Sequence, residues 1–160
     1  VGRGLSAAVS DGTNIILGGG AKFSGNSDNY HSMIDTWTSA TPSNATYFGE
    51  MTISGFNRAA GYDTTRAVFA SGWTGTGQVN VIDYITMATP SNALDFGDLT
   101  AGEYAAGTSD GTLVCFAGGT GLGVNIHKIT IQTLGNATDT GYDLLTNYSN
   151  GSGGVSGSSS

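Results

Sequence analysis

One stretch of about twenty residues occurs three times in this chain, and this repetition limits the folds that the chain can adopt. Each copy has an apolar run, a turn that contains asparagine, and a second short run that contains glycine. The copies are MIDTWTSATPSNATYFGEM at 33–51, VIDYITMATPSNALDFGDL at 81–99 and NIHKITIQTLGNATDTGYDL at 125–144. The turn asparagines, Asn44, Asn92 and Asn136, lie 48 and 44 positions apart. A period of this length indicates a repeat protein built from small, similar units.

Each repeat is expected to contain four short strands, because four apolar segments alternate with residues that favour turns. In the first repeat these segments lie at 5–9, 14–17, 33–38 and 46–53. The predicted repeats span about 3–53, 54–100 and 101–145. Residues 147–160 are interpreted as the start of a fourth repeat or as a Gly/Ser-rich tail.

The composition favours strands over helices. Glycine accounts for 27 of the 160 residues, and only 11% of the chain is charged. Gly, Ser, Thr and Asn are weak helix formers, whereas short strands joined by tight turns use them well. The sequence therefore predicts an all-β fold made of three four-stranded repeats, each of about 45–50 residues.

Two kinds of turn residue recur with the repeat. Asp-Gly at 11–12 and at 110–111 lies between apolar runs, which favours a type I′ hairpin turn. The three turn asparagines are expected to adopt the left-handed conformation, which asparagine tolerates. Three glycines follow them at a spacing of five positions and are predicted to be structural residues of the repeat: Gly49, Gly97 and Gly141.

The loop between the second and third segments changes in length from repeat to repeat. From the glycine cluster to the next apolar run it covers 14, 10 and 7 positions in the three repeats. Variable loops at one place in a repeat emerge on one face, which is a candidate binding surface. Three aromatic residues, Phe23, Tyr30 and Trp73, lie in these loops and are the candidate binding residues. Aromatic rings beside Asn and Asp can stack on a glycan, and they can also pack at repeat or subunit contacts.

The charge distribution argues against nucleic acid as a partner. The net charge is −7, and the five basic residues are scattered singly, whereas a nucleic-acid surface needs a basic cluster. No apolar run reaches the length of a membrane span, so membrane insertion is not expected.

No catalytic or cofactor-binding pattern is found. His31 and His127 lack the spacing of a metal site, and a metal site needs three or four convergent ligands. Cys115, the single cysteine, lies in an apolar run and is expected to be a buried, inert thiol. The sequence thus predicts a protein without metal, cofactor or enzymatic activity.

The chain resembles kelch-type propeller repeats. The similarity lies in the glycine cluster that closes the second strand and in the strand that follows it. It is carried by IILGGG at 15–20 with IDTW at 34–37, VFASG at 68–72 with IDYI at 82–85, and VCFAGG at 114–119 with IHKI at 126–129. A narrower resemblance comes from IDYITMATPSNALDFGDLT at 82–100 and DTTRAVFASG at 63–72. These segments are similar to the kelch-like repeats of virion and tail-fibre proteins of tailed bacteriophages.

That resemblance implies a structural component of a virus particle, in a tail fibre or at the particle surface, with contact to the host through the repeat loops. The expected location is therefore the virion. Propellers close with four to eight blades, so three repeats imply an open propeller or one that is completed by oligomerisation. Two chains could form a six-bladed ring, the repeats could stack into a fibre with neighbouring chains, or the sequence could be part of a longer one; oligomeric assembly is the expectation. The expected partners are further copies of the chain, other virion proteins, or a glycan of the host surface.

Two other functions remain open from the sequence. A glycan-binding module of the adhesin type would use the same loop face. Some secreted kelch-type propellers are copper oxidases with Tyr and His ligands and a Tyr–Cys crosslink, and this chain has seven Tyr, two His and one Cys. A glycan array separates the first two functions, and copper content would favour the third.

Overall fold

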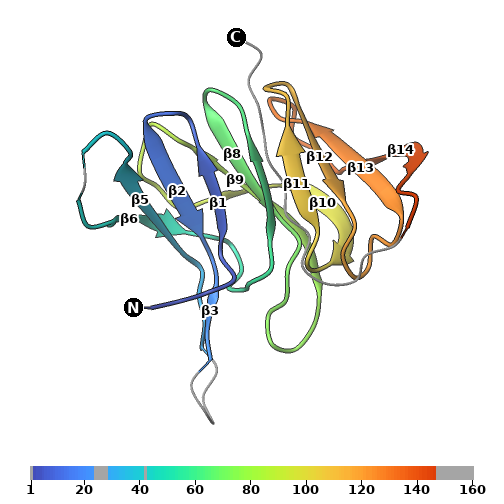
Figure 1. Cartoon of the computed structure of the whole chain (residues 1–160), viewed down its shortest axis with the longest axis horizontal. Coiled ribbons are helices and arrows are strands. Elements are labelled where there is room, and N and C mark those ends of the chain that lie inside the picture. The colour runs from blue at the N-terminus through green and yellow to red at the C-terminus, as the bar shows by residue number, and fades with distance from the viewer. Residues whose placement is uncertain (1, 24–28, 42, 147–160) are drawn as a thin grey trace.

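The computed structural model describes residues 2–23, 29–41 and 43–146, and these form an all-β structure (Figure 1). The prediction of an all-β fold with four-stranded sheets is confirmed. The strands are β1 (Ala7–Ser10), β2 (Asn14–Gly18), β3 (Ala21–Lys22), β4 (Asn29–Tyr30), β5 (Met33–Thr38), β6 (Thr46–Glu50), β7 (Ala59–Tyr62), β8 (Arg66–Ala70), β9 (Val79–Thr86), β10 (Leu94–Gly102), β11 (Ala106–Ser109), β12 (Leu113–Ala117), β13 (Asn125–Thr130) and β14 (Thr138–Asp143). The predicted fourth repeat at 147–160 lies outside the described residues.

Three four-stranded antiparallel sheets follow one another along the chain, each with its strands paired in sequence order. Sheet 1 is β1-β2-β5-β6, sheet 2 is β7-β8-β9-β10, and sheet 3 is β11-β12-β13-β14. A small two-stranded sheet, β3-β4, projects from the connection between β2 and β5 (Figure 1). The first strands of the three sheets are neighbours, because β7 contacts both β1 and β11. Sheet 2 therefore lies between the other two sheets.

The position of each sheet explains the burial of its side chains. In β8, Val68 and Phe69 point to opposite faces of sheet 2, and both are fully buried. In β2 of sheet 1, Ile16 is buried, whereas Ile15 and Leu17 on the opposite face are only half-buried. Sheet 2 thus has two covered faces, and each outer sheet has one.

Two apolar cores fill the spaces between the sheets. The core between sheets 1 and 2 contains Ala7, Val9, Ile16, Ile34, Phe48, Met51, Ala67, Phe69, Ile85, Met87 and Ala93. The core between sheets 2 and 3 contains Ala59, Val68, Ala70, Ile82, Phe96, Leu99, Ala105, Val114, Phe116, Leu122, Ile129 and Ile131. Within the described part of the chain, no helix has the length and apolar character needed to cross a membrane.

The turn between the first two strands of each sheet is organised by an aspartate side chain. Gly12 and Gly111 have positive φ, but Asp11 and Asp110 do not, so the predicted type I′ turns are wrong. A type I′ turn needs positive φ at both central residues. Here the Asp11 Oδ1 atom accepts hydrogen bonds from the backbone N–H groups of Thr13 and Asn14, at 2.8 and 2.6 Å. The carboxylate thereby holds the turn in place of a second left-handed residue.

Asp63 holds the corresponding turn of sheet 2 without a glycine. Its Oδ1 atom accepts hydrogen bonds from the N–H groups of Thr65 and Arg66, both at 2.7 Å. Gln132 of sheet 3 donates to the second carboxylate oxygen. Burial acts to raise the pKa of Asp63, but these hydrogen bonds from Gln132, Arg66 and Thr65 outweigh it, so the pKa lies below its ordinary value of 3.8. The ionised form of Asp63 therefore stabilises the folded state.

We expect Asp63→Asn to flatten the acid limb of the stability profile. Because the folded pKa is lowered, the contribution of Asp63 is complete above the unfolded value and is lost as the pH falls through the folded value. The wild-type chain should therefore lose stability below about pH 4, and the variant should lose less of its own stability over the same range. Urea unfolding at a series of pH values measures this. Parallel curves for the two proteins would contradict the assignment.

The predicted left-handed conformation of the turn asparagines is wrong, because Asn44, Asn92 and Asn136 have no positive φ. Asn92 and Asn136 instead link neighbouring sheets. The Oδ1 atom of Asn92 accepts a hydrogen bond from the backbone N–H of Glu50 at 3.1 Å. The Oδ1 atom of Asn136 accepts one from Asp98 at 2.9 Å. Asparagine thus recurs because its side chain satisfies a backbone donor on the last strand of the preceding sheet.

Gly49 and Gly97 are the structural residues that allow this docking. A Cβ atom at Gly49 would overlap the carbonyl oxygen of Ser91, and one at Gly97 would overlap that of Gly135. Gly141 of sheet 3 has nothing within 4 Å and a φ of 75°. The first two glycines are therefore required by close backbone contact, whereas Gly141 is required by its conformation.

Gly49→Ala should destabilise the fold by about 1–3 kcal/mol, because the docked turn has to move away from β6. Gly77→Ala is the matched control, since Gly77 has no atom within 4 Å and no positive φ. This control should leave the free energy of unfolding within about 1 kcal/mol of wild type. Chemical denaturation compares the free energies of unfolding of the two variants. Equal values would show that the contact between Gly49 and the Ser91 carbonyl can accommodate a methyl group.

Candidate binding face

The connections that follow β2, β8 and β12 lie at one end of the molecule, at the bottom of Figure 1. We call this end the loop face: residues 19–23, 29–32, 71–78 and 118–124, together with the segments 2–6, 52–58 and 103–105 that lead into the first strand of each sheet. Backbone hydrogen bonds connect these segments, as in the bond from Gly20 N–H to Gly55 O at 2.8 Å. The face is therefore a connected surface, although its loops differ in length.

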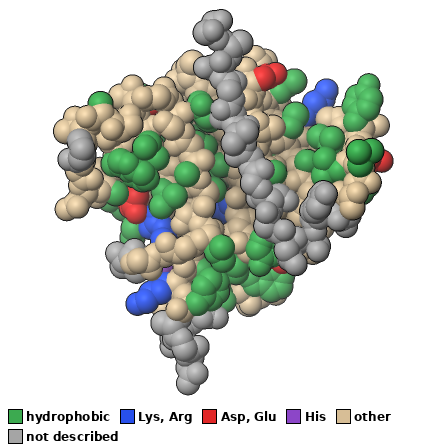
Figure 2. Space-filling model, in the orientation of Figure 1, with side chains coloured by type: hydrophobic (Ala, Val, Ile, Leu, Met, Phe, Trp, Pro, Cys, Tyr) green, Lys and Arg blue, Asp and Glu red, His purple; other side chains and the backbone are tan. Residues whose placement is uncertain are grey.

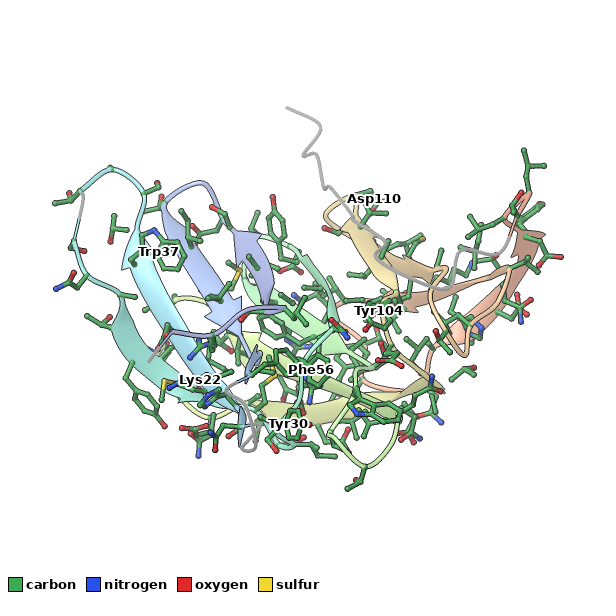
Figure 3. All side chains as sticks on the ribbon, turned by 60° about the horizontal axis from the view of Figure 1, so that its bottom comes forward. Lys22, Tyr30, Trp37, Phe56, Tyr104 and Asp110 are labelled. Atoms are coloured by element: carbon green, nitrogen blue, oxygen red, sulfur yellow. The ribbon has the colours of Figure 1, made fainter. Side chains whose placement is uncertain are left out.

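An aromatic cluster lies at the centre of the loop face (Figure 3). The ring of Tyr30 stacks on Phe56 with a centroid distance of 5.4 Å and an interplanar angle of 12°. Phe23 meets the same ring edge-on, at 5.4 Å and 89°. Phe56 is buried, whereas 54% of Phe23 is exposed. Phe56 thus anchors two rings, one of which is largely open to solvent.

The loop at 73–78 holds the cluster from a second side. Trp73 and Phe56 form an antiparallel bridge with two backbone hydrogen bonds of 3.0 and 3.1 Å. Gly75 lies against the ring of Tyr30, since a Cβ atom on it would overlap that ring. Trp73 itself is half-buried. The structure therefore brings Phe23 and Tyr30 together and places Trp73 beside their anchor through its backbone.

Phe56 has no signal in the sequence pattern. The residues that make the corresponding backbone bridge in the other two sheets are Gly4 and Glu103. A ring at this position is therefore a feature of sheet 2 alone and not of the repeat. Only the folded structure shows that Phe23 and Tyr30 share it as a support.

An open groove adjoins the cluster. Its volume is about 540 Å³, and it is lined by residues 2–5 and 21–23. Leu5 and Phe23 expose apolar surface there, and the Lys22 side chain is also exposed. The Arg3 side chain is directed elsewhere, because its Nη2 atom pairs with the Asp35 carboxylate at 2.9 Å. The groove thus combines apolar walls with one exposed cation.

Four described non-glycine residues of the loop face are held in the left-handed region: Ser71, with a φ of 56°, and one residue before the first strand of each sheet. Leu5, Asn57 and Tyr104 have φ values of 57°, 56° and 59°. The N–H of Asn57 donates to the Leu5 carbonyl at 3.0 Å, and that of Tyr104 donates to the Asn57 carbonyl at 3.1 Å. Left-handed Leu and Tyr are strained, so these contacts between sheets determine the backbone conformation here.

The histidines and the cysteine do not converge. His127 is buried in β13, His31 is half-buried on the loop face, and Cys115 is half-buried in β12. The expected burial of Cys115 is wrong, because its neighbours Val114 and Phe116 point into the core and alternation turns the thiol to the other face. Within the described ranges, no group of three His, Cys, Asp or Glu residues is arranged to hold a metal ion.

The chain was compared with known proteins. No protein-family model matches it, and a search of curated proteins finds no similar sequence.

Proposed function

We propose that the chain is a non-enzymatic structural module of a virus particle, built from three kelch-like propeller blades. The support for blades is that sheets 1, 2 and 3 have the same strand order, with neighbouring first strands. Sheets 1 and 2 each receive the turn of the next sheet on their last strand, at Glu50 and at Asp98. The support for a particle component is the resemblance of residues 63–72 and 82–100 to bacteriophage virion repeats.

The aromatic cluster carries the second part of the proposal, which is that the loop face contacts the host surface. A half-exposed phenyl ring on a rigid support loses little side-chain entropy when a ligand stacks on it. Phe23 has such a support in Phe56, and the adjoining groove gives a sugar ring apolar walls. The groove also offers Lys22 as a hydrogen-bond donor for hydroxyl or carboxylate groups.

Phe23→Ala should weaken adsorption to the host surface, or binding to the best glycan on an array, by about five- to tenfold, because one ring–ligand contact is lost. Leu134→Ala is the matched control. Leu134 is 53% exposed and lies in the β13–β14 turn, at the end of the molecule opposite the loop face. Equal binding by both variants, with intact folds, would remove the loop face from the proposal.

A glycan-binding module outside a virus particle is the second candidate, and the stacked pair of Tyr30 and Phe56 favours it equally. The two candidates differ in their context. A glycan-binding module should bind its sugar as an isolated protein, whereas a particle component acting only as a structural element should bind none. A glycan array with the purified chain tests for sugar binding, and where a sugar is bound, the presence or absence of the chain in virus particles separates the two candidates.

A further inference from the structure

Sheets 1 and 3 each have one face that no other described sheet covers, and on sheet 1 the Arg3 side chain lies over part of it, beside Leu17 and Asp35. On sheet 1, Ile15, Leu17 and Trp37 lie on this free face, and all three are half-buried (Trp37 in Figure 3). On sheet 3, Cys115 and Ile126 lie on the corresponding outer side and are half-buried as well. Figure 2 shows hydrophobic side chains at the surface over both sheets on the same side of the molecule. The two faces are therefore turned toward the same side of the molecule.

The two internal joints, between sheets 1 and 2 and between sheets 2 and 3, use the same backbone hydrogen bonds. A glycine in the loop after the second strand donates to the residue two positions before the left-handed residue of the next sheet: Gly20 N–H to Gly55 O at 2.8 Å, and Gly72 N–H to Gly102 O at 2.7 Å. The left-handed residue of each later sheet donates to that of the earlier sheet, at 3.0 and 3.1 Å. The two surfaces of a joint are therefore different: the earlier sheet and the later sheet each contribute their own set of donors and acceptors.

The docked turn is the third element of each joint. Ala93 N–H donates to the Glu50 carbonyl at 2.8 Å, and Ala137 N–H donates to the Asp98 carbonyl at 2.8 Å, beside the asparagine bonds described above. The turn of sheet 1 has the same sequence, Thr-Pro-Ser-Asn-Ala, as the docked turn at 89–93. Its Asn44 and Ala45 are exposed, and no described strand receives them. Sheet 1 thus presents a docking turn without a partner.

The unused groups at the two ends of the chain match each other. Sheet 3 presents the Gly119 N–H, the Tyr104 carbonyl and the edge of β14. On that edge Asp143 occupies the position of Glu50 in sheet 1, because Asp143 pairs with Asn125 as Glu50 pairs with Met33. Sheet 1 presents the Arg3 carbonyl, the Leu5 N–H and the Asn44 turn. Within the described ranges none of these named backbone groups has a hydrogen-bond partner. If the pattern of the internal joints is continued, the Gly119 N–H donates to the Arg3 carbonyl and the Leu5 N–H donates to the Tyr104 carbonyl. The Asn44 turn then docks on β14.

We propose that two copies of the chain join at both ends, sheet 3 of each copy against sheet 1 of the other, to form a closed ring of six sheets. Joining both ends buries both free faces and uses every unpaired group named above, and a two-fold axis relates the copies. The β14 bulge between Asp139 and Asp143 has one residue more than the β10 bulge between Asp95 and Asp98. The surface on which the Asn44 turn docks therefore differs from that of β10, and this contact has to adjust. Gly141, with open space around it, gives β14 the freedom to do so.

Sedimentation velocity of the full chain at micromolar concentration tests the ring. We expect a dimer, and we expect Trp37→Arg to raise the dissociation constant at least about tenfold, because it places a charge in the joint. Thr76→Arg is the control, since it adds the same charge at an exposed position in the loop that follows β8 of the middle sheet, and it should remain dimeric. Asn44→Ala should weaken the dimer to a smaller extent while leaving the unfolding curve of the monomer unchanged.

Three results would overturn the proposal. The first is a monomer that Trp37→Arg does not change. The second is a monomeric full chain that dimerises once residues 147–160 are removed, because that segment would then be the cover of sheet 3. The third is a series of ever longer oligomers, which would mean that the joints do not close a ring. The dimer depends only on the joints, so glycan or host binding by a monomer would leave the proposed function intact.

Discussion

Replacing Asp83 with alanine should lower the free energy of unfolding by about 3–5 kcal/mol, because it leaves a buried guanidinium without its counter-charge. The Arg58 and Asp83 side chains are 1% and 0% exposed, with 3.8 Å between Arg58 Nη1 and Asp83 Oδ2. Asp83 also accepts hydrogen bonds from the hydroxyl and the backbone N–H of Thr52. Arg58 Nη2 donates to the Ile53 carbonyl at 2.6 Å. The pair thus connects the 52–58 segment to β9.

The pKa values of the pair show what its burial costs. Burial raises the pKa of the Asp83 carboxyl above its ordinary value, and the hydrogen bonds from Thr52 and the charge of Arg58 oppose this only in part. Burial likewise lowers the pKa of Arg58, against the charge of Asp83. Each charge is therefore tolerated in the core because of the other. When one is removed, the desolvation free energy of the remaining charge is no longer offset by its partner.

Two comparisons test this interpretation by urea unfolding. Asp35→Ala removes the corresponding carboxylate of sheet 1. Asp35 is 24% exposed, and its partner Arg3, which is 4% exposed, keeps a hydrogen bond to the Leu17 carbonyl, so the loss should be smaller than that for Asp83→Ala. The double variant Arg58→Met, Asp83→Leu should recover a large part of the loss, because no unpaired charge remains. A loss for Asp83→Ala no larger than that for Asp35→Ala would contradict the account.

Phe69→Ala is expected to have a comparable effect, about 3–5 kcal/mol, through a cavity between sheets 1 and 2. Phe69 is fully buried in β8 and belongs to a core with Ile16, Ile34 and Phe48. Its ring also approaches Gly18, where a Cβ atom would lie 3.0 Å from the Phe69 Cε1 atom. Because β2 and β8 are the second strands of neighbouring sheets, they are held by their own ladders and cannot easily collapse into the space.

Phe23→Ala removes the same atoms from a ring that is half-exposed and is the control for this prediction. Its loss should be about 1 kcal/mol, since it gives up one aromatic contact and little buried area. Thermal unfolding at one fixed protein concentration compares the two. A similar shift for both variants would mean that the core between sheets 1 and 2 relaxes around the missing ring.

The repeated sequence determined most of the local structure. Short runs rich in apolar and β-branched residues and bounded by turn residues, such as 81–87, predict strands before any tertiary contact is known. The Gly-rich and Asp-containing segments between these runs predicted where the chain turns. The four-stranded sheets follow from these two signals, because four short apolar runs separated by tight turns pair in sequence order.

The details of the turns required the tertiary structure. The sequence placed a turn at Asn92 but attributed its recurrence to backbone conformation, whereas the side chain bonds to Glu50, 42 positions earlier. The same holds for Cys115, which the apolar pattern placed in a core. Only one face of sheet 3 packs against another sheet, and Cys115 lies on the other face. The sequence pattern does not indicate which face of a strand is covered.

The candidate binding site was also predictable from the sequence only in part. Phe23 and Tyr30 were recognisable from the sequence as aromatic residues in loops of variable length. Their common support, Phe56, comes from a segment more than twenty positions further on and has no counterpart in the other sheets. The sequence by itself determined the strands, the turns and their order, because these depend on neighbours within a few residues. The tertiary structure alone decided the joints between sheets, the aromatic cluster and the two uncovered faces, because these depend on the packing of segments that are distant in the chain.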